Sequence, residues 1–269
     1  MEYIIIAIKG LIIGATMTVP GVSGGTMAMI IGIYQQLIAA VNGIFHHPKK
    51  SAAFLLAFIA GAGIGILALS GLINRVLEDP QLGLILRFFF VGAVAGGIPF
   101  IFKRAVSERY TYSILAYVGV GILLVGVIVL LPEGTFSVYD SKGIAGAIIQ
   151  LAGGIILALD MILPGISTSH LMYTLGMYEQ VIGCITSFQI IKLIPMALGT
   201  IIGIFLFSAL IERLLDKYPR QTYLVILGFM IGSVYELLPK HAGGNLFLCC
   251  LSGITGFLIM YLIAGREEK

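Results

Sequence analysis

Long apolar stretches separated by short polar segments make up most of the chain. Six stretches are long enough to cross a bilayer as a helix, which takes about 20 apolar residues: 52–73, 83–102, 111–131, 190–211, 221–238 and 245–264. Two longer apolar regions, 3–44 and 144–188, are each interrupted near the middle by a Pro-Gly motif. We expect each to form a broken helical hairpin, either a re-entrant loop or two helices packed side by side. In both cases the chain returns to the side from which it came.

Composition agrees with a membrane protein and excludes several other classes. Of the 269 residues, 59% are hydrophobic and 11% are charged, and the mean hydropathy is +1.06. A soluble domain carries about 25% charged residues. These values exclude a soluble enzyme, a disordered scaffold and a nucleic-acid-binding protein. The cysteines Cys184, Cys249 and Cys250 match no metal or redox spacing, and we expect neither a metal nor a cofactor.

Lysine and arginine residues divide unevenly between the two sides of the membrane in this topology. If both hairpins return, the side with more of them holds Lys49, Lys50, Lys103, Arg104, Arg109, Arg213, Lys217, Arg220, Arg266 and Lys269. The other side holds Arg75, Lys142, Lys192 and Lys240. The positive-inside rule places the first group in the cytoplasm, and both termini with it.

The two interrupted regions resemble each other. Met17-Thr-Val-Pro-Gly-Val-Ser-Gly-Gly-Thr26 recurs 144 residues later as Met161-Ile-Leu-Pro-Gly-Ile-Ser-Thr-Ser-His170, and Gly32 and Tyr34 recur as Gly176 and Tyr178. Each half then holds one hairpin and three spans, so the second half must be inserted upside down. The predicted fold is an all-α polytopic membrane protein with two inverted-topology repeats, as in many secondary transporters. The repeats are 1–131 and 144–269, joined by an outer-side linker, 132–143.

Small and hydroxyl-bearing residues follow each Pro-Gly pair and are candidates for an anion site. A helix that begins there presents free N–H groups and the positive end of its dipole. Hydroxyl groups add donors, and glycine lets the backbone approach closely. We predict substrate binding by Ser23, Gly24, Gly25, Thr26, Ser167, Thr168, Ser169 and His170. The alternative is that Pro-Gly only breaks the helix and that the serines only cap it.

Charged side chains inside the apolar segments are further candidates, because charge at membrane depth is costly. Lys9 and Arg87 are predicted to contact an anionic substrate, or else to extend to the membrane surface. Asp160 and Glu179 are predicted to couple transport to H⁺ or Na⁺. The alternative for these acids is a structural pairing with a buried cation or a backbone donor.

Two stretches carry a resemblance to a known family: Pro20-Gly-Val-Ser-Gly-Gly-Thr-Met-Ala28, and Leu163-Pro-Gly-Ile-Ser167 with Leu175-Gly-Met-Tyr-Glu179. They resemble motifs of the bacterial polyprenyl-phosphate transporter family, over essentially the full chain. The resemblance implies a non-enzymatic carrier that returns undecaprenyl phosphate, the lipid carrier of cell-wall synthesis, from the outer to the inner leaflet of the cytoplasmic membrane. It implies roles for Pro20, Gly21, Ser23, Gly24, Gly25, Thr26, Pro164, Gly165, Ser167 and Ser169. The chain departs from the family pattern at Thr16-Met-Thr18, Thr168 and His170.

Other functions stay open. An ion-coupled transporter of a small water-soluble anion would use the same helix termini without a side opening to lipid. An undecaprenyl diphosphate phosphatase carries a Pro-Gly-x-Ser-Arg-Ser type of motif, but Thr168 stands where that arginine is expected. The first half also lacks the clustered glutamates that metal-assisted hydrolysis needs. A channel or an assembly factor is a further alternative, and the oligomeric state, a homodimer included, is open.

Overall fold

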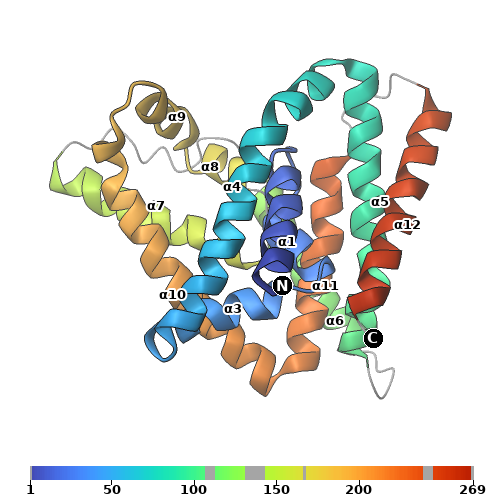
Figure 1. Ribbon diagram of the computed structural model, residues 1–269, viewed down its shortest axis with the longest axis horizontal. Coiled ribbons are helices and arrows are strands. Elements are labelled where there is room, and N and C mark those ends of the chain that lie inside the picture. The colour runs from blue at the N-terminus through green and yellow to red at the C-terminus, as the bar shows by residue number, and fades with distance from the viewer. Residues whose placement is uncertain (1, 107–112, 131–142, 166–167, 239–244, 268–269) are drawn as a thin grey trace.

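A computed structural model describes residues 2–106, 113–130, 143–165, 168–238 and 245–267, and every regular element in this part is a helix (Figure 1). The first half contains α1 (Glu2–Met17), α2 (Gly24–Ile30), α3 (Tyr34–Asn42), a 3₁₀ turn η1 (Gly43–Phe45), α4 (Pro48–Glu78), α5 (Pro80–Ala105) and α6 (Ser113–Leu130). The second half repeats the order with α7 (Ile144–Ile162), α8 (Thr168–Thr174), α9 (Tyr178–Thr186), η2 (Ile190–Leu193), α10 (Ile194–Lys217), α11 (Pro219–Leu237) and α12 (Leu246–Glu267).

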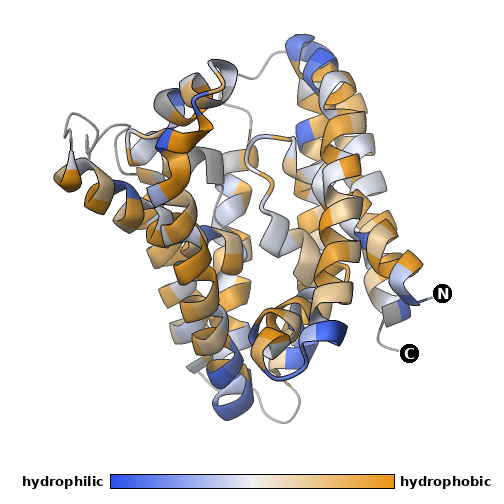
Figure 2. Cartoon of the chain, turned by 60° about the vertical axis from the view of Figure 1, so that its left-hand side comes forward, coloured by the Kyte–Doolittle hydropathy of each residue, from blue (hydrophilic) through white to orange (hydrophobic). Residues whose placement is uncertain are grey.

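Five of the described helical segments are long and apolar enough to cross a membrane, or six if the bent pair α2–α3 counts as one. They are α4, α5, α7, α10 extended by η2, and α12. Hydrophobic residues cover the sides of the long helices, and hydrophilic residues gather mainly at their ends (Figure 2). The chain is therefore an all-helical multi-pass membrane protein, as predicted from the sequence.

The predicted spans correspond to helices of the structure. The ranges 52–73, 83–102, 190–211 and 245–264 lie within the membrane-length segments, whereas 111–131 corresponds to the shorter helix α6 and 221–238 to α11. Helix α7, which the sequence assigned to one arm of a hairpin, is itself long and apolar enough to cross. The division into repeats stays a prediction, and the linker 132–143 lies outside the described residues except for Gly143.

Each interrupted region contains two breaks, where the sequence suggested one. We call α1–α3 hairpin one and α7–α9 hairpin two. The first break in each follows Pro-Gly, whose glycine has a positive φ, 89° at Gly21 and 93° at Gly165. The second break lies at Gly32 and Gly176, with φ of 75° and 69°. Helices α2 and α8, and likewise α3 and α9, begin and end at positions 144 residues apart.

The second break is a Schellman motif in both hairpins. The N–H of Ile33 donates to the carbonyl of Ala28 at 3.0 Å, and the N–H of Met177 donates to that of Met172 at 2.9 Å. Ile33 and Met177 are both fully buried, and such a motif needs a residue that tolerates positive φ, usually glycine, just before the apolar one. Hydropathy does not reveal this break, because a single glycine leaves an apolar stretch apolar.

Glycines allow the helices to pack closely in two kinds of pair. Within each half, Gly61 of α4 lies against the backbone of Ala7 on α1, and Gly199 of α10 lies against Leu151 on α7. Between the halves, α5 packs on α12 and α6 packs on α11. A β-carbon at Gly61 or Gly199 would collide with a carbonyl of the partner helix, so these small residues set the distance between the helices.

Candidate functional site

The two Pro-Gly breaks meet inside the protein. A β-carbon at Gly25 would lie 3.2 Å from both the Cα and the N of Pro164, so the start of α2 packs directly on the backbone after α7. The hydroxyl of Tyr34 donates to the carbonyl of Ile162 at 2.7 Å. These contacts join hairpin one to the first break of hairpin two, although the two segments lie far apart in sequence.

The start of α2 has the geometry of a capped helix terminus. Ser23 occupies the N-cap in an extended conformation, and its Oγ accepts a bond from the N–H of Thr26 at 3.4 Å. Ser23 and Thr26 are 6% and 1% exposed. The Thr26 hydroxyl has no hydrogen-bond partner among the described residues. Because the first N–H groups of a helix lack partners within that helix, this buried terminus offers donors to a ligand.

A cavity of about 210 Å³ lies beside this terminus, and we call it the central cavity. Ser23, Gly24 and Gly25 line it from the first break, and Asp160 lines it from the end of α7. Asp160 is 2% exposed. Most of the remaining lining is apolar and comes from α1, α3, α4 and α10. Residues that the sequence assigned to binding and a residue that it assigned to coupling therefore line one cavity.

The other predicted site residues, Thr26 among them, are not in the lining of this cavity in the part of the chain that the structure describes. The ammonium of Lys9 donates to the carbonyl of Ile31 at 3.2 Å, at the C-terminal end of α2. Arg87 is half-buried on α5, and Glu179 is exposed in the first turn of α9. Ser167 lies outside the described residues, and Thr168, Ser169 and His170 form the start of α8, where only the backbone is described. Their roles stay predictions.

Polar bonds between the halves are the main feature that the sequence did not reveal. The amide of Asn42 donates to the Glu212 carboxylate at 2.7 Å, and the Ser208 hydroxyl donates to the Asn42 oxygen at 2.7 Å. Gln35 donates to the hydroxyl of Tyr223 at 2.7 Å. The available signal was the presence of Asn and Glu inside or beside apolar stretches, which marks polar pairing at membrane depth.

The described residues contain no group of three His, Cys, Asp or Glu side chains arranged to hold a metal ion. What the structure presents instead is a small cavity at the point where two broken helices meet, among helices of membrane length. That architecture is typical of membrane transporters with a binding site near the midplane.

Comparisons with known proteins narrow this class to a family. A family model described as undecaprenyl phosphate translocase-like matches residues 13–246. The chain is 31% identical to a "Polyprenyl-phosphate transporter" of Vibrio cholerae, over 89% of this chain and 79% of that protein. It is also 31% identical to a "Polyprenyl-phosphate transporter" of Staphylococcus aureus, over 96% of this chain and 95% of that protein. No solved structure matches significantly. The chain belongs to the undecaprenyl phosphate translocase-like family.

Proposed function

We propose that this chain carries polyprenyl phosphate, undecaprenyl phosphate in the cell, across the bacterial cytoplasmic membrane without reacting with it. The family indicates the class of substrate. The central cavity is the observation that links this function to particular residues, because it lies beside a helix terminus with a nearby hydroxyl. Its volume of about 210 Å³ is large enough for a phosphate headgroup.

In this proposal the headgroup is held by the first turn of α2. A phosphate oxygen accepts bonds from the N–H groups of Gly24 and Gly25 and from the hydroxyls of Ser23 and Thr26, which support it as at other anion-binding helix termini. Pro164 packs on Gly25, so the Pro-Gly break of hairpin two lies on the far side of the same terminus. Ser167, Thr168, Ser169 and His170 follow it and are proposed to contact the headgroup from that side.

Asp160 is the residue that we propose to couple lipid transport to a cation. A carboxylate and a phosphate in one cavity repel each other by about 4 kcal/mol at a separation of about 4 Å and an effective dielectric constant of 20. A proton or a Na⁺ ion on Asp160 removes this repulsion. We therefore propose that the lipid and the cation bind together, with Asp160 as the principal coupling residue and Glu179 as a second candidate.

Orientation follows from the charge distribution of the sequence. Both termini are proposed to lie in the cytoplasm, so hairpin two enters from the outer side and its break loads first, while hairpin one releases the headgroup inside. Lys9 and Arg87 are proposed to attract the anionic head during this passage. Arg87→Gln should then weaken lipid binding more than Arg87→Lys does, because the ammonium of lysine keeps the charge.

The test is transport of a fluorescent short-chain polyprenyl phosphate in proteoliposomes under imposed pH and Na⁺ gradients. We expect Ser23→Ala to slow transport by about tenfold, since one bond to a charged group is lost. Ser233→Ala is the matched control, because Ser233 is also buried and, among the described residues, its hydroxyl donates to the Met230 carbonyl of its own helix. Asp160→Asn should keep binding and lose any dependence on the gradient.

Three results would contradict the proposal. Wild-type protein that leaves the labelled lipid in its original leaflet is not a translocase under these conditions. Release of inorganic phosphate from undecaprenyl diphosphate would favour the phosphatase. Equal transport of methyl phosphate and polyprenyl phosphate would favour a carrier of small anions. Size-exclusion chromatography of the same preparation tests whether the transporter is a homodimer.

A further inference from the structure

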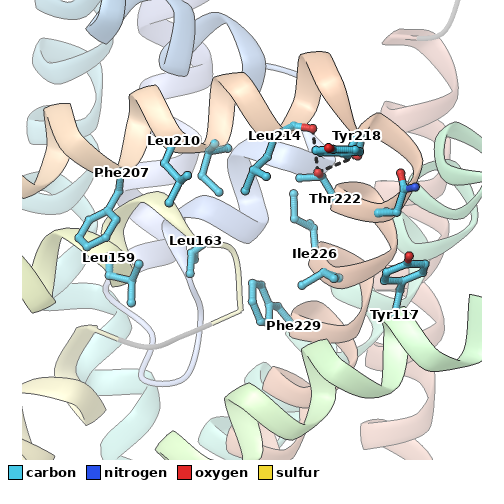
Figure 3. Close-up of a pocket in the computed structure, with 13 residues that line it drawn as sticks. Tyr117, Leu159, Leu163, Phe207, Leu210, Leu214, Tyr218, Thr222, Ile226 and Phe229 are labelled. Atoms are coloured by element: carbon cyan, nitrogen blue, oxygen red, sulfur yellow. Dashed lines mark hydrogen bonds between the residues drawn. The ribbon is translucent and has the colours of Figure 1, made fainter.

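A second space, of about 500 Å³, lies between α6, α7, α10 and α11, and we call it the lateral groove (Figure 3). Most of its lining is apolar and includes Leu159, Leu163, Phe207, Leu210, Ile226 and Phe229. Its polar side chains, among them Tyr218 and Thr222, lie toward one end in the view of Figure 3. The Thr222 hydroxyl already donates to the carbonyls of Leu214 and Tyr218. The lining contains no charged residue, so the groove does not suit a phosphate.

The groove and the central cavity share two walls. Along the last turn of α7, Asp160, Met161 and Ile162 line the cavity, whereas Leu159 and Leu163 line the groove. Helix α10 also lines both spaces, with Ile204 at the cavity and Phe207 about one turn further along at the groove. An apolar space of more than twice the volume therefore lies next to the cavity that Ser23 and Asp160 line.

The groove also reaches the Pro-Gly break of hairpin two and the outer surface of the bundle. Leu163 immediately precedes Pro164, and the backbone of Phe229 packs on Gly165. On α10 the side chain of Leu210 is 49% exposed, so this part of the lining is open at the surface of the bundle. The groove thus has one end at the Pro-Gly break of hairpin two and another part at the exposed side of α10.

We propose that the lateral groove binds the first isoprene units of the substrate while its phosphate occupies the central cavity. This inference rests on the proposed function, because it assigns the chain of the same lipid whose head the cavity holds. A lipid with an anionic head and a long apolar chain needs a polar site and an apolar path side by side. The shared walls provide that arrangement, and the exposed edge lets the rest of the chain stay in the bilayer.

The experiment compares binding of methyl phosphate, farnesyl phosphate and undecaprenyl phosphate to the full-length protein in detergent. In wild type, affinity should rise with chain length, because apolar surface is buried in the groove. Leu210→Trp fills the groove and should lower affinity for the two prenyl phosphates by about tenfold, with methyl phosphate unchanged. Leu198→Trp is the matched control, because Leu198 lies on the same helix, is 50% exposed and is not part of the groove.

A second measurement tests which molecule occupies the groove. Farnesyl phosphate with a photoreactive group on its first isoprene unit should label α10 or α11 in wild type, and labelling should fall in Leu210→Trp but not in Leu198→Trp. Equal labelling by a phospholipid with the same group on its acyl chain would overturn the proposal, since the groove would then hold bulk lipid. The proposal would also be overturned if affinity rose equally with chain length in wild type and in Leu210→Trp.

Different results contradict the groove assignment and the proposed function. If Ser23→Ala and Asp160→Asn impair transport of polyprenyl phosphate while Leu210→Trp changes neither binding nor labelling, the groove assignment is wrong and the proposed function stands. If wild-type protein binds and moves no polyprenyl phosphate, the proposed function itself is wrong.

Discussion

Hairpin one and hairpin two follow the same backbone path but are held in the protein by different means. Their short helices have equal lengths, and the glycines at the breaks have nearly equal φ. Helix α2 is buried from Gly25 to Ile30 and belongs to the main hydrophobic core. The buried residues of α8 and α9 instead form two small clusters with α7 and η2.

Three corresponding positions show the difference. Tyr34 bonds to Ile162 in the other half, whereas Tyr178 stacks on Tyr173 of its own hairpin, with ring centroids 4.0 Å apart. Gln35 bonds to Tyr223 of α11, and its counterpart Glu179 is exposed.

Asn42 bonds to two side chains of α10, while Thr186 donates to carbonyls of its own helix. In Figure 1, α3 lies next to α10, and α9 lies toward the upper left. The repeated glycines set the path of the backbone, and the partners that the corresponding side chains contact decide how firmly each hairpin is held.

The largest effect is expected where the two breaks touch. Gly25→Val would push side-chain atoms into the backbone at Pro164 and should lower the free energy of unfolding by about 3 kcal/mol and abolish most transport. The matched variant is Gly24→Ala, whose β-carbon has its nearest contacts with the side chain of Met17, which can move. Its cost should stay below about 1 kcal/mol. Thermal unfolding in detergent measures both, and equal losses would show that the breaks do not depend on this close contact.

A smaller effect is expected at the far end of the hairpins. Asn42→Ala leaves the Glu212 carboxylate and the Ser208 hydroxyl without this partner and should cost about 2 kcal/mol. Thr186→Ala removes exposed bonds within one helix and should stay within about 0.5 kcal/mol. The same unfolding measurement applies. If Thr186→Ala costs as much as Asn42→Ala, the two hairpins are held equally and the comparison fails.

Much of the backbone could be predicted from the sequence. Apolar length predicted the helices, and the recurrence of Pro-Gly-x-Ser predicted a break in each half, because proline and glycine act locally. The second break was missed although Gly32 and Gly176 were noticed as a repeated pair. A glycine in a Schellman motif and a glycine in a close helix contact look alike in sequence, and only the backbone conformation separates them.

The site was predictable only in part. Ser23 and Asp160 were both identified as single candidates, since each is polar in an apolar stretch. That they line one cavity depends on how α2 packs against the end of α7, which no local pattern records. The pairing of α5 with α12 and of α6 with α11 has the same cause. The lateral groove, lined mostly by ordinary Leu, Ile and Phe residues, has no sequence signal.

The bond from Tyr34 should have an intermediate effect. Tyr34→Phe keeps the ring in its buried position but leaves the Ile162 carbonyl without this donor, at an expected cost of about 1 kcal/mol. Tyr178→Phe keeps the stacking on Tyr173 and should change stability by less than about 0.5 kcal/mol. Thermal unfolding of the two variants in detergent measures both losses of stability. A larger loss in Tyr178→Phe would mean that hairpin two depends on its tyrosine more than hairpin one does.

The smallest effect is expected at the next position of each hairpin. Gln35→Ala removes one bond to Tyr223, and hydrogen bonds between membrane helices contribute about 0.6 kcal/mol on average. Glu179→Gln changes an exposed side chain and should leave stability within about 0.5 kcal/mol. The informative readout for this pair is transport under a pH gradient. If Asp160 alone carries the coupling cation, Glu179→Gln keeps the gradient dependence of wild type. Loss of that dependence in Glu179→Gln, with normal binding, would instead make the exposed acid of hairpin two part of the coupling path and would show that the weakly held hairpin takes up the cation.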